Sequence, residues 1–448
     1  MPQPTLTEVQ NWFAALDPKV PLVDADDPRQ VDLDANEDAR RGDALPFVDA
    51  LLRTMRLADQ SGRSRQLVTG PWGCGKTTEL RRLQHRLEAA DSVLPSRVVW
   101  IDAEQYIDRY APPGITDLLL VLAYAIDREA RSIRGQSPDG PDSLVSRIGH
   151  FLQSDVTVTG LTLSAPGVDV MGEIKANASF RQRVRERLEA SFQAFAKEAR
   201  TSIAQSVADI ASAKGGQRVV VIVDGLEKFQ ALNVVGAKEM ASAVEAVFLS
   251  HGEWLELPCH VIYSIPLWLR WRTAALGGEH DSSPITLPNL KLCNQEGTEN
   301  APGIDALVRL LGRRMDLDKG FGGANSPVLH HLLRASGGYL RDALRLARDA
   351  VREAQEFPIR PEVAERIIRR LGAEYEVVAL RSDLGLLAQI AAEKVLPEGE
   401  EAQANARELM ERFLVLLYRN GDEWVDVHPV LAQRPRIKAR FVEILGSG

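Results

Sequence analysis

The fold of this chain is decided by Gly70-Pro71-Trp72-Gly73-Cys74-Gly75-Lys76-Thr77-Thr78, a stretch that fits the pattern G-x-x-x-x-G-K-S/T. Gln66-Leu67-Val68-Thr69 before it forms a short run with an apolar centre, which predicts a β-strand. Residues 78–90 after it carry leucines at helical spacing, which predicts an α-helix. A strand, a glycine-rich loop and a helix in this order predict a loop that wraps around phosphate groups.

The residue types in this phosphate loop explain the expected chemistry. Glycines allow the backbone to curl so that successive N–H groups point at the β- and γ-phosphates, and the positive end of the following helix adds to that field. We expect Lys76 to contact the terminal phosphates and the Thr77 hydroxyl to bind Mg²⁺. The predicted cofactors are ATP and Mg²⁺. The expected binding residues are Gly70, Pro71, Trp72, Gly73, Cys74, Gly75, Lys76, Thr77 and Thr78.

Composition narrows the class of protein. The 448 residues are 45% hydrophobic and 26% charged, which is ordinary for a globular protein with a substantial core. A net charge of −8 gives no overall basic field for nucleic acid, and three cysteines are too few for a disulfide framework. No leader sequence opens the chain and no apolar run is long enough for a membrane span. We therefore expect a cytoplasmic protein without a membrane partner.

A second stretch carries acidic residues at the end of a predicted strand. Residues 219–223 form a continuous apolar run, typical of a buried parallel strand, and Asp224-Gly225-Leu226-Glu227 follows. After a phosphate loop, Asp224 is the expected partner of Mg²⁺, directly or through a water. Glu227 is the candidate to orient or activate the attacking water, although its placement depends on the turn through Gly225.

Two further residues are candidates for contacts with a nucleotide. Ser264 ends a fourth predicted strand, where it either lies near the γ-phosphate or only caps the following turn. Arg341 falls in the first turn of a helix that starts after Gly337-Gly338, and a basic side chain is not the favoured charge there. An anionic partner outside the helix and an ordinary salt bridge both remain open for Arg341. Arg270 and Arg272, which follow the fourth strand, are left unassigned.

Two regions extend beyond this nucleotide-binding pattern. Alternating apolar residues from Val156 to Ile174 predict a β-hairpin, and residues from about 179 to 213 predict one long charged helix. This insertion is either decoration of the core or a surface for a partner chain or self-assembly. Near the end of the chain, helices over 384–394 and 402–413 precede a hairpin that turns at Asn420-Gly421, which favours a small winged-helix domain.

The order of these motifs resembles the AAA+/STAND class of P-loop ATPases, including its Orc/Cdc6-like and KAP-like members, over roughly residues 40–440. The resemblance implies an α/β fold with a parallel sheet in 5-1-4-3-2 order, a helical lid and a C-terminal winged helix. The domains expected from it are an N-terminal arm (1–43), an ATPase core (44–300) with the insertion at about 153–213, a helical lid (301–380) and a winged-helix-like domain (381–448).

The same resemblance implies roles by position. Lys76, Glu227, Ser264 and Arg341 would take part in catalysis, with Ser264 as a first sensor and Arg341 as a second, and Thr77 and Asp224 would bind the metal. AAA+ enzymes place a Glu directly after the metal-binding Asp, whereas here Gly225 stands there. The Asp-Gly-Leu-Glu form is more similar to STAND and KAP-like ATPases, which act as switches.

The predicted function is therefore an ATP-binding, slowly hydrolysing switch that controls assembly or a separately encoded effector. A looser resemblance to bacterial conflict-system ATPases extends this prediction to defence. The competing interpretation is a DNA-binding initiator or loader that uses the winged helix. The basic tail from Arg434 to Arg440 favours DNA, whereas Glu408 and Glu411 oppose it because DNA requires a basic face.

Overall fold

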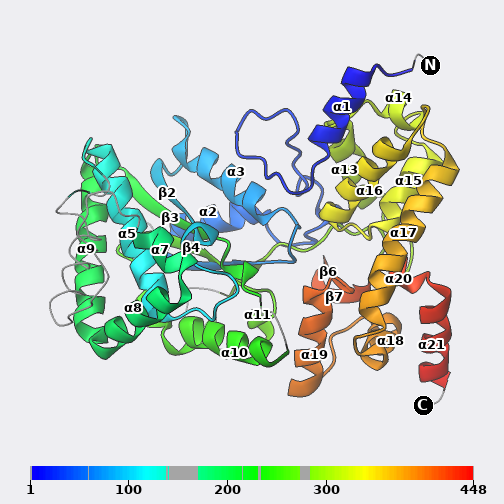
Figure 1. Cartoon of the computed structure of the whole chain (residues 1–448). Helices are drawn as coiled ribbons and strands as arrows, with labels where there is room; N and C mark the ends of the chain where they lie inside the picture. Colours follow the sequence, from blue (N-terminus) through cyan, green and yellow to red (C-terminus); the bar gives the residue numbers. More distant parts are fainter. Residues whose placement is uncertain are drawn as a thin grey trace. The chain divides into compact units, whose positions relative to one another are not determined.

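The chain forms two compact units, shown in Figure 1, and each is described by itself. The computed structural model describes residues 3–58, 60–137, 140, 170–213, 215–230, 234–272 and 283–446. We call Val48–Thr69 with Arg82–Thr286 the sheet unit, and Met1–Phe47, Gly70–Arg81 and Leu287–Gly448 the helical unit. The phosphate loop belongs to the helical unit, although along the chain it directly follows the first strand of the sheet unit.

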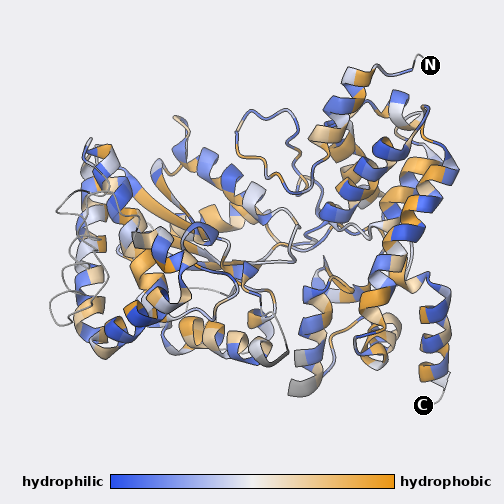
Figure 2. Cartoon of the chain, in the orientation of Figure 1, coloured by the Kyte–Doolittle hydropathy of each residue, from blue (hydrophilic) through white to orange (hydrophobic). Residues whose placement is uncertain are grey.

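Five strands build the sheet unit: β1 (Ser64–Thr69), β2 (Ser96–Asp102), β3 (Arg218–Asp224), β4 (His260–Ser264) and β5 (Ile285–Thr286). Their spatial order is β2-β3-β4-β1-β5, and every hydrogen-bonded pair is parallel. This order confirms the predicted 5-1-4-3-2 sheet and the P-loop NTPase fold. Residues 219–223 of β3 are all β-branched and buried, as a central parallel strand requires. Figure 2 shows the hydrophobic residues concentrated along these strands.

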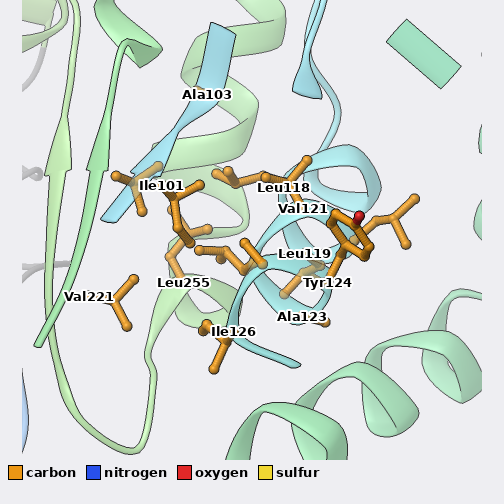
Figure 3. Packing of buried hydrophobic residues seen from close by; sticks show 14 of the residues in the cluster. Ile101, Ala103, Leu118, Leu119, Val121, Ala123, Tyr124, Ile126, Val221 and Leu255 are labelled. Carbon is orange, nitrogen blue, oxygen red and sulfur yellow. The ribbon is translucent and has the colours of Figure 1, made fainter. Parts of the chain in front are cut away.

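The core of the sheet unit lies where two long helices meet the sheet. Helices α5 (Ile115–Ile133) and α9 (Phe192–Ala213) pack along each other, and α5 also contacts β2 while α9 contacts β3. Figure 3 shows α5 side chains such as Leu118 gathered beside Ile101 of β2 and Val221 of β3. Because both the sheet and α9 cover α5, its residues 118–127 are buried on every side.

The remaining elements of this unit are shorter or peripheral. Helix α2 (Phe47–Leu57) begins at Phe47, the last residue of the first segment of the helical unit, and α3 (Lys76–Glu88) is shared by the two units. The others are α4 (Ala103–Tyr106), α7 (Val170–Ala176), α8 (Ala178–Ala190), η2 (Leu226–Lys228), α10 (Val234–Glu245), the π-helix η3 (Ala246–Ser250), η4 (Gly252–Leu255) and α11 (Leu269–Arg272).

The insertion differs from the sequence prediction in two respects. Residues 170–176 form helix α7, so the prediction of a strand through Ile174 is wrong; the rest of the predicted hairpin lies outside the described residues. Met171 and Ile174 are buried together, which shows that the apolar spacing followed a helical face. The predicted single helix over 179–213 is two helices: α8 ends at Ala190, Ser191 follows as its C-cap residue, and α9 begins at Phe192.

The helical unit is built around a second core. Trp12 and Leu16 of the N-terminal arm are buried in the same cluster as residues of α13, α15, α16 and α17. The elements of this part are α1 (Leu6–Ala15), η1 (Glu37–Ala39), α13 (Ala301–Gly312), α14 (Leu317–Phe321), α15 (Pro327–Ala335), α16 (Leu340–Glu353) and α17 (Pro361–Ala379). The arm is therefore an integral part of this core.

The end of the helical unit is a compact helix–hairpin segment, residues 384–446. It comprises α18 (Leu384–Glu393), α19 (Glu400–Glu411), β6 (Val415–Asn420), β7 (Asp422–Val427), α20 (Pro429–Ala432) and α21 (Pro435–Gly446). Strands β6 and β7 pair antiparallel about Gly421, which confirms the predicted hairpin. Within the described residues, no helix has both the length and the apolar character that crossing a bilayer requires.

Candidate functional site

The phosphate loop runs from the residue after β1 to the start of α3. Lys76 is buried, and its Nζ donates hydrogen bonds to the carbonyls of Gly70 (2.8 Å) and Pro71 (3.0 Å). The ammonium group therefore points toward the start of the loop. A curled glycine loop that encloses a lysine ammonium at a helix N-terminus has the features that a polyphosphate requires. The residues present therefore fit the predicted nucleotide.

Arg341 lies against this loop. Helix α16 begins at Leu340, which places Arg341 in its first turn as the sequence predicted. Gly73 has a φ of +76°, and a Cβ built on it would lie 2.9 Å from Nε of Arg341. Only glycine combines this backbone conformation with so close an approach. The structure thus brings together two of the predicted site residues from separate parts of the helical unit.

The acidic residues lie at one edge of the sheet unit. In parallel strands the carboxyl ends share an edge, and the register places Asp102 of β2 directly beside Asp224 of β3. Ser264 ends the next strand, β4, on the same edge. Asp224 is buried, and a carboxylate is the hard oxygen ligand that Mg²⁺ prefers, so its chemistry fits the predicted metal.

Glu227 reaches this edge through the turn at Gly225. The φ of Gly225 is +92°, in the left-handed region that a glycine adopts readily, and the 3₁₀ turn η2 follows it. Glu227 is buried in η2, and Oε2 of Glu227 accepts a hydrogen bond from Oγ of Ser264 at 2.6 Å. Two predicted site residues are thus in direct contact, and the Ser264 hydroxyl restrains the carboxylate that was expected to act on water.

Lys228 and Glu104 form an ion pair that the sequence did not suggest. Nζ of Lys228 contacts Oε2 of Glu104 at 2.5 Å and so fastens η2 to helix α4. Burial lowers the pKa of Lys228, but the hydrogen bond with Glu104 and the charges of Glu227, Glu104 and Asp224 outweigh it and raise the pKa overall. Lys228 is therefore a fixed positive charge next to the acidic edge.

A buried arginine supports the phosphate loop from the N-terminal arm. Nε of Arg40 lies 2.7 Å from Oδ1 of Asp34, and Nη2 lies 3.2 Å from Oε1 of Glu79 in the first turn of α3. Burial lowers the pKa of Arg40, yet the two carboxylates raise it overall. The stretch Arg40-Arg41-Gly42-Asp43 has no pattern that distinguishes a buried arginine from an exposed one, so sequence reasoning missed this contact.

The two arginines left unassigned fall at α11. Arg270 is in contact with the Thr286 hydroxyl of β5, which engages its guanidinium within the sheet unit. Arg272 is the last residue of α11, beside a stretch outside the described residues.

No protein-family model and no curated protein sequence matches this chain. Among solved structures, a chain of Drosophila ORC bound to DNA has a TM-score of 0.41 and 11% identity, over 99% of this chain and 94% of that one. Cdc6p from Pyrobaculum aerophilum has a TM-score of 0.32 and 13% identity, over 97% of this chain and 98% of that one. Likeness this distant does not assign the chain to a family.

Proposed function

We propose that this chain is a P-loop ATPase of the AAA+ class that works as a nucleotide-controlled switch. The observation that carries this proposal is the phosphate loop itself, in which Lys76 is held between the Gly70 and Pro71 carbonyls directly after β1 of a 5-1-4-3-2 sheet. Lys76 and the loop N–H groups would hold the phosphates of ATP, and Thr77 and Asp224 would bind Mg²⁺. The bound Mg²⁺ would supply charge stabilisation to the phosphates.

The contact between Ser264 and Glu227 fixes the orientation of the candidate base. Oε2 of Glu227 accepts the hydrogen bond from Ser264 at 2.6 Å, and the other carboxylate oxygen, Oε1, would be the one to orient a water. Slow turnover rests on the resemblance of the Asp-Gly-Leu-Glu form to switch ATPases. Ser264 would then act as the predicted sensor, because it links the ends of β3 and β4 through Glu227. Arg341 would act as the second sensor from the start of α16, where it lies against Gly73.

The proposal includes what nucleotide binding would control. We propose that residues 301–380 act as the lid and residues 381–448 as a winged-helix-like domain, and that nucleotide binding in the cytoplasm controls assembly of the chain or a separately encoded effector. A role in bacterial defence rests on the resemblance described above. In this scheme the chain itself binds and releases the nucleotide, and a binding assay tests that step directly.

Binding of a fluorescent ATP analogue tests the site. Lys76→Ala should abolish Mg²⁺-dependent binding, whereas Lys238→Ala, which changes an exposed lysine on α10, should leave it unchanged. Glu227→Gln should retain binding and lose turnover, and Ser264→Ala should change turnover without loss of binding. Equal binding by the wild type and Lys76→Ala would remove the proposal. Size-exclusion chromatography with and without ATP then tests whether nucleotide controls assembly.

A second candidate is DNA binding through α21. Arg436 and Lys438 are exposed on this helix, whereas Arg434 pairs with Glu376 at 2.7 Å and Arg440 pairs with Glu443 at 2.8 Å. If α21 contacts phosphates, neutralising Arg436 and Lys438 should lower the salt slope of DNA binding by about 0.9 per contact. No binding of duplex DNA at about 50 mM salt would exclude this candidate.

A further inference from the structure

Phe413 is an unusual residue in this fold. It stands between α19 and β6, and its φ is +60°, a left-handed conformation that bulky side chains rarely adopt. Within the described residues, Lys394 is the one other non-glycine residue with a positive φ. A conformation of this kind persists when the surrounding contacts determine it, and such residues gather at functional positions. The role of the left-handed conformation of Phe413 is therefore sought in the residues that its ring contacts.

The Phe413 ring packs against the start of α16. It stacks on the ring of Tyr339, with centroids 5.2 Å apart and planes 18° apart. Tyr339 is buried and is the N-cap residue of α16. Cζ of Arg341 lies 6.0 Å from the centroid of the Phe413 ring, at the limit of a cation–π contact. Phe413 thus contacts both the residue that starts the helix and the arginine in its first turn.

The same ring also contacts the phosphate loop. The ring of Trp72 lies 6.2 Å from that of Phe413, with the planes tilted by 54°. A Cβ at Gly73 would lie 2.9 Å from Nε of Arg341 and 3.1 Å from the hydroxyl of Tyr339. Arg341 therefore lies close to both the loop backbone and the Phe413 ring. We call Trp72, Tyr339, Arg341 and Phe413 the aromatic clasp.

A second, independent tether holds the helix–hairpin segment in the same unit. The backbone N–H and the side-chain amide of Asn289 both donate to the carbonyl of Leu417 in β6, at 3.0 and 3.2 Å. The N–H of Leu290 donates to the carbonyl of Gly338. Because these bonds do not involve Phe413, the segment should stay folded when the Phe413 ring is altered.

We propose that Phe413 is a positioning residue that holds Arg341 against Gly73 and so couples the helix–hairpin segment to nucleotide binding. The proposal deepens the proposed function and rests on it, because Arg341 is useful in this place only if the loop binds phosphates. Phe413 does not touch the nucleotide in this scheme. It acts through Arg341, so displacement of residues 384–446 would release the arginine, and a bound nucleotide that holds the arginine would favour the docked segment.

The test compares Phe413→Leu, Phe413→Tyr and Arg341→Ala with the wild type. Leu keeps an apolar side chain at this position but removes the ring, so Phe413→Leu should weaken binding of the fluorescent ATP analogue about three- to tenfold. Phe413→Tyr should restore binding. The double variant Phe413→Leu/Arg341→Ala should bind no more weakly than Arg341→Ala alone, because both changes remove the same contact. Phe357→Leu is the matched control, since Phe357 forms an aromatic pair with Trp12 elsewhere in the unit.

Amide exchange supplies a second readout that does not depend on nucleotide. In Phe413→Leu, residues 72–78 should exchange faster than in the wild type, while residues 361–379 of α17 keep their protection. If the wild type binds ATP, Lys76→Ala does not, and Phe413→Leu binds as the wild type does, the inference is overturned. If the wild type does not bind ATP, the proposed function fails and the coupling to nucleotide fails with it. Faster loop exchange in Phe413→Leu would then support only the positioning of the loop by Phe413, and unchanged loop exchange would overturn that as well.

Discussion

Replacing Arg40 by Met should destabilise the helical unit strongly, although Arg40 is not a predicted nucleotide ligand. The side chain of Arg40 is 1% exposed, and those of its partners Asp34 and Glu79 are 5% and 4% exposed. Arg40→Met keeps the apolar length of the side chain and removes the positive charge. Two carboxylates then remain buried without that counter-charge, and Oδ2 of Asp34 still accepts the N–H of Phe47 at 2.9 Å.

The expected loss follows from the cost of removing one partner of a buried ion pair. Removing one partner of a buried ion pair costs about 3–5 kcal/mol, which is a factor of about 10² to 10³ or more in the folding equilibrium. Neutralising all three residues, as Asp34→Asn/Arg40→Met/Glu79→Gln, should recover most of the loss because the two carboxylate charges are then removed together with the positive charge. Arg86→Met is the matched control. Arg86 pairs with Asp49 at 2.6 Å, but these side chains are 48% and 45% exposed, so its loss should be within about 1 kcal/mol.

Urea unfolding followed by amide exchange gives the measurement. Exchange resolved along the chain separates residues 76–81 of α3 and the N-terminal arm from the sheet unit, whose strands should keep their protection in Arg40→Met. A free energy of unfolding for Arg40→Met within about 1 kcal/mol of the wild type, or a triple variant as unstable as the single one, would contradict this prediction. In either case Arg40 would not be the group that stabilises the two buried carboxylates.

Three further predictions follow from single contacts. Gly225→Ala places a side chain at φ +92° and should cost about 1–2 kcal/mol, read as a lower thermal midpoint; an unchanged midpoint would contradict it. The Lys319 hydrogen bond and the bonds from Thr5 lower the pKa of Glu8 from 4.5 to about 2. Because this pKa is depressed, the contact stabilises above pH 4.5 and is lost as pH falls toward 2. Protection of α1 should fall in that window, and Glu8→Gln should remove the dependence. Lys228→Met should lower the kcat of ATP turnover with little change in KM, as Glu104→Gln should, and a changed KM alone would refute a positioning role.

Local rules account for the parts of the fold that the sequence predicted. The conformations of β3 and of the glycine loop before α3 are each determined by a few consecutive residues, so each could be recognised without knowledge of the rest of the chain. The Asn420-Gly421 turn likewise fixes its hairpin through the turn residues. The sheet order was implied by the resemblance to the AAA+/STAND class, and the structure confirms it.

The errors arose where two structures satisfy one pattern. Val170 and Ile174 suit an alternating strand, but a spacing of four also suits one face of a helix, and burial of Met171 and Ile174 decided for the helix. Ser191 follows the end of α8, in a stretch whose charged residues and alanines suggested one continuous helix. Serine has an intermediate helix propensity and occurs both inside helices and at their ends, so its presence did not mark the break.

The contacts between distant segments could not be predicted from the sequence. Arg40 with Glu79 and Phe413 with Trp72 join residues far apart in the chain, and no spacing rule connects them. The Ser264–Glu227 hydrogen bond is an intermediate case. Both residues were predicted site residues, but their contact depends on the turn through Gly225.

The division of the chain has a consequence for its synthesis. The chain passes from one unit to the other after Phe47, Thr69, Arg81 and Thr286. As the ribosome proceeds, every residue of the sheet unit is available once Thr286 has emerged, whereas the arm and the phosphate loop must wait for Leu287–Gly448. A nascent chain of this protein therefore carries the phosphate loop well before Tyr339 and Arg341, which lie against Gly73, have been synthesised, so the loop reaches its final packing only after α16 has emerged.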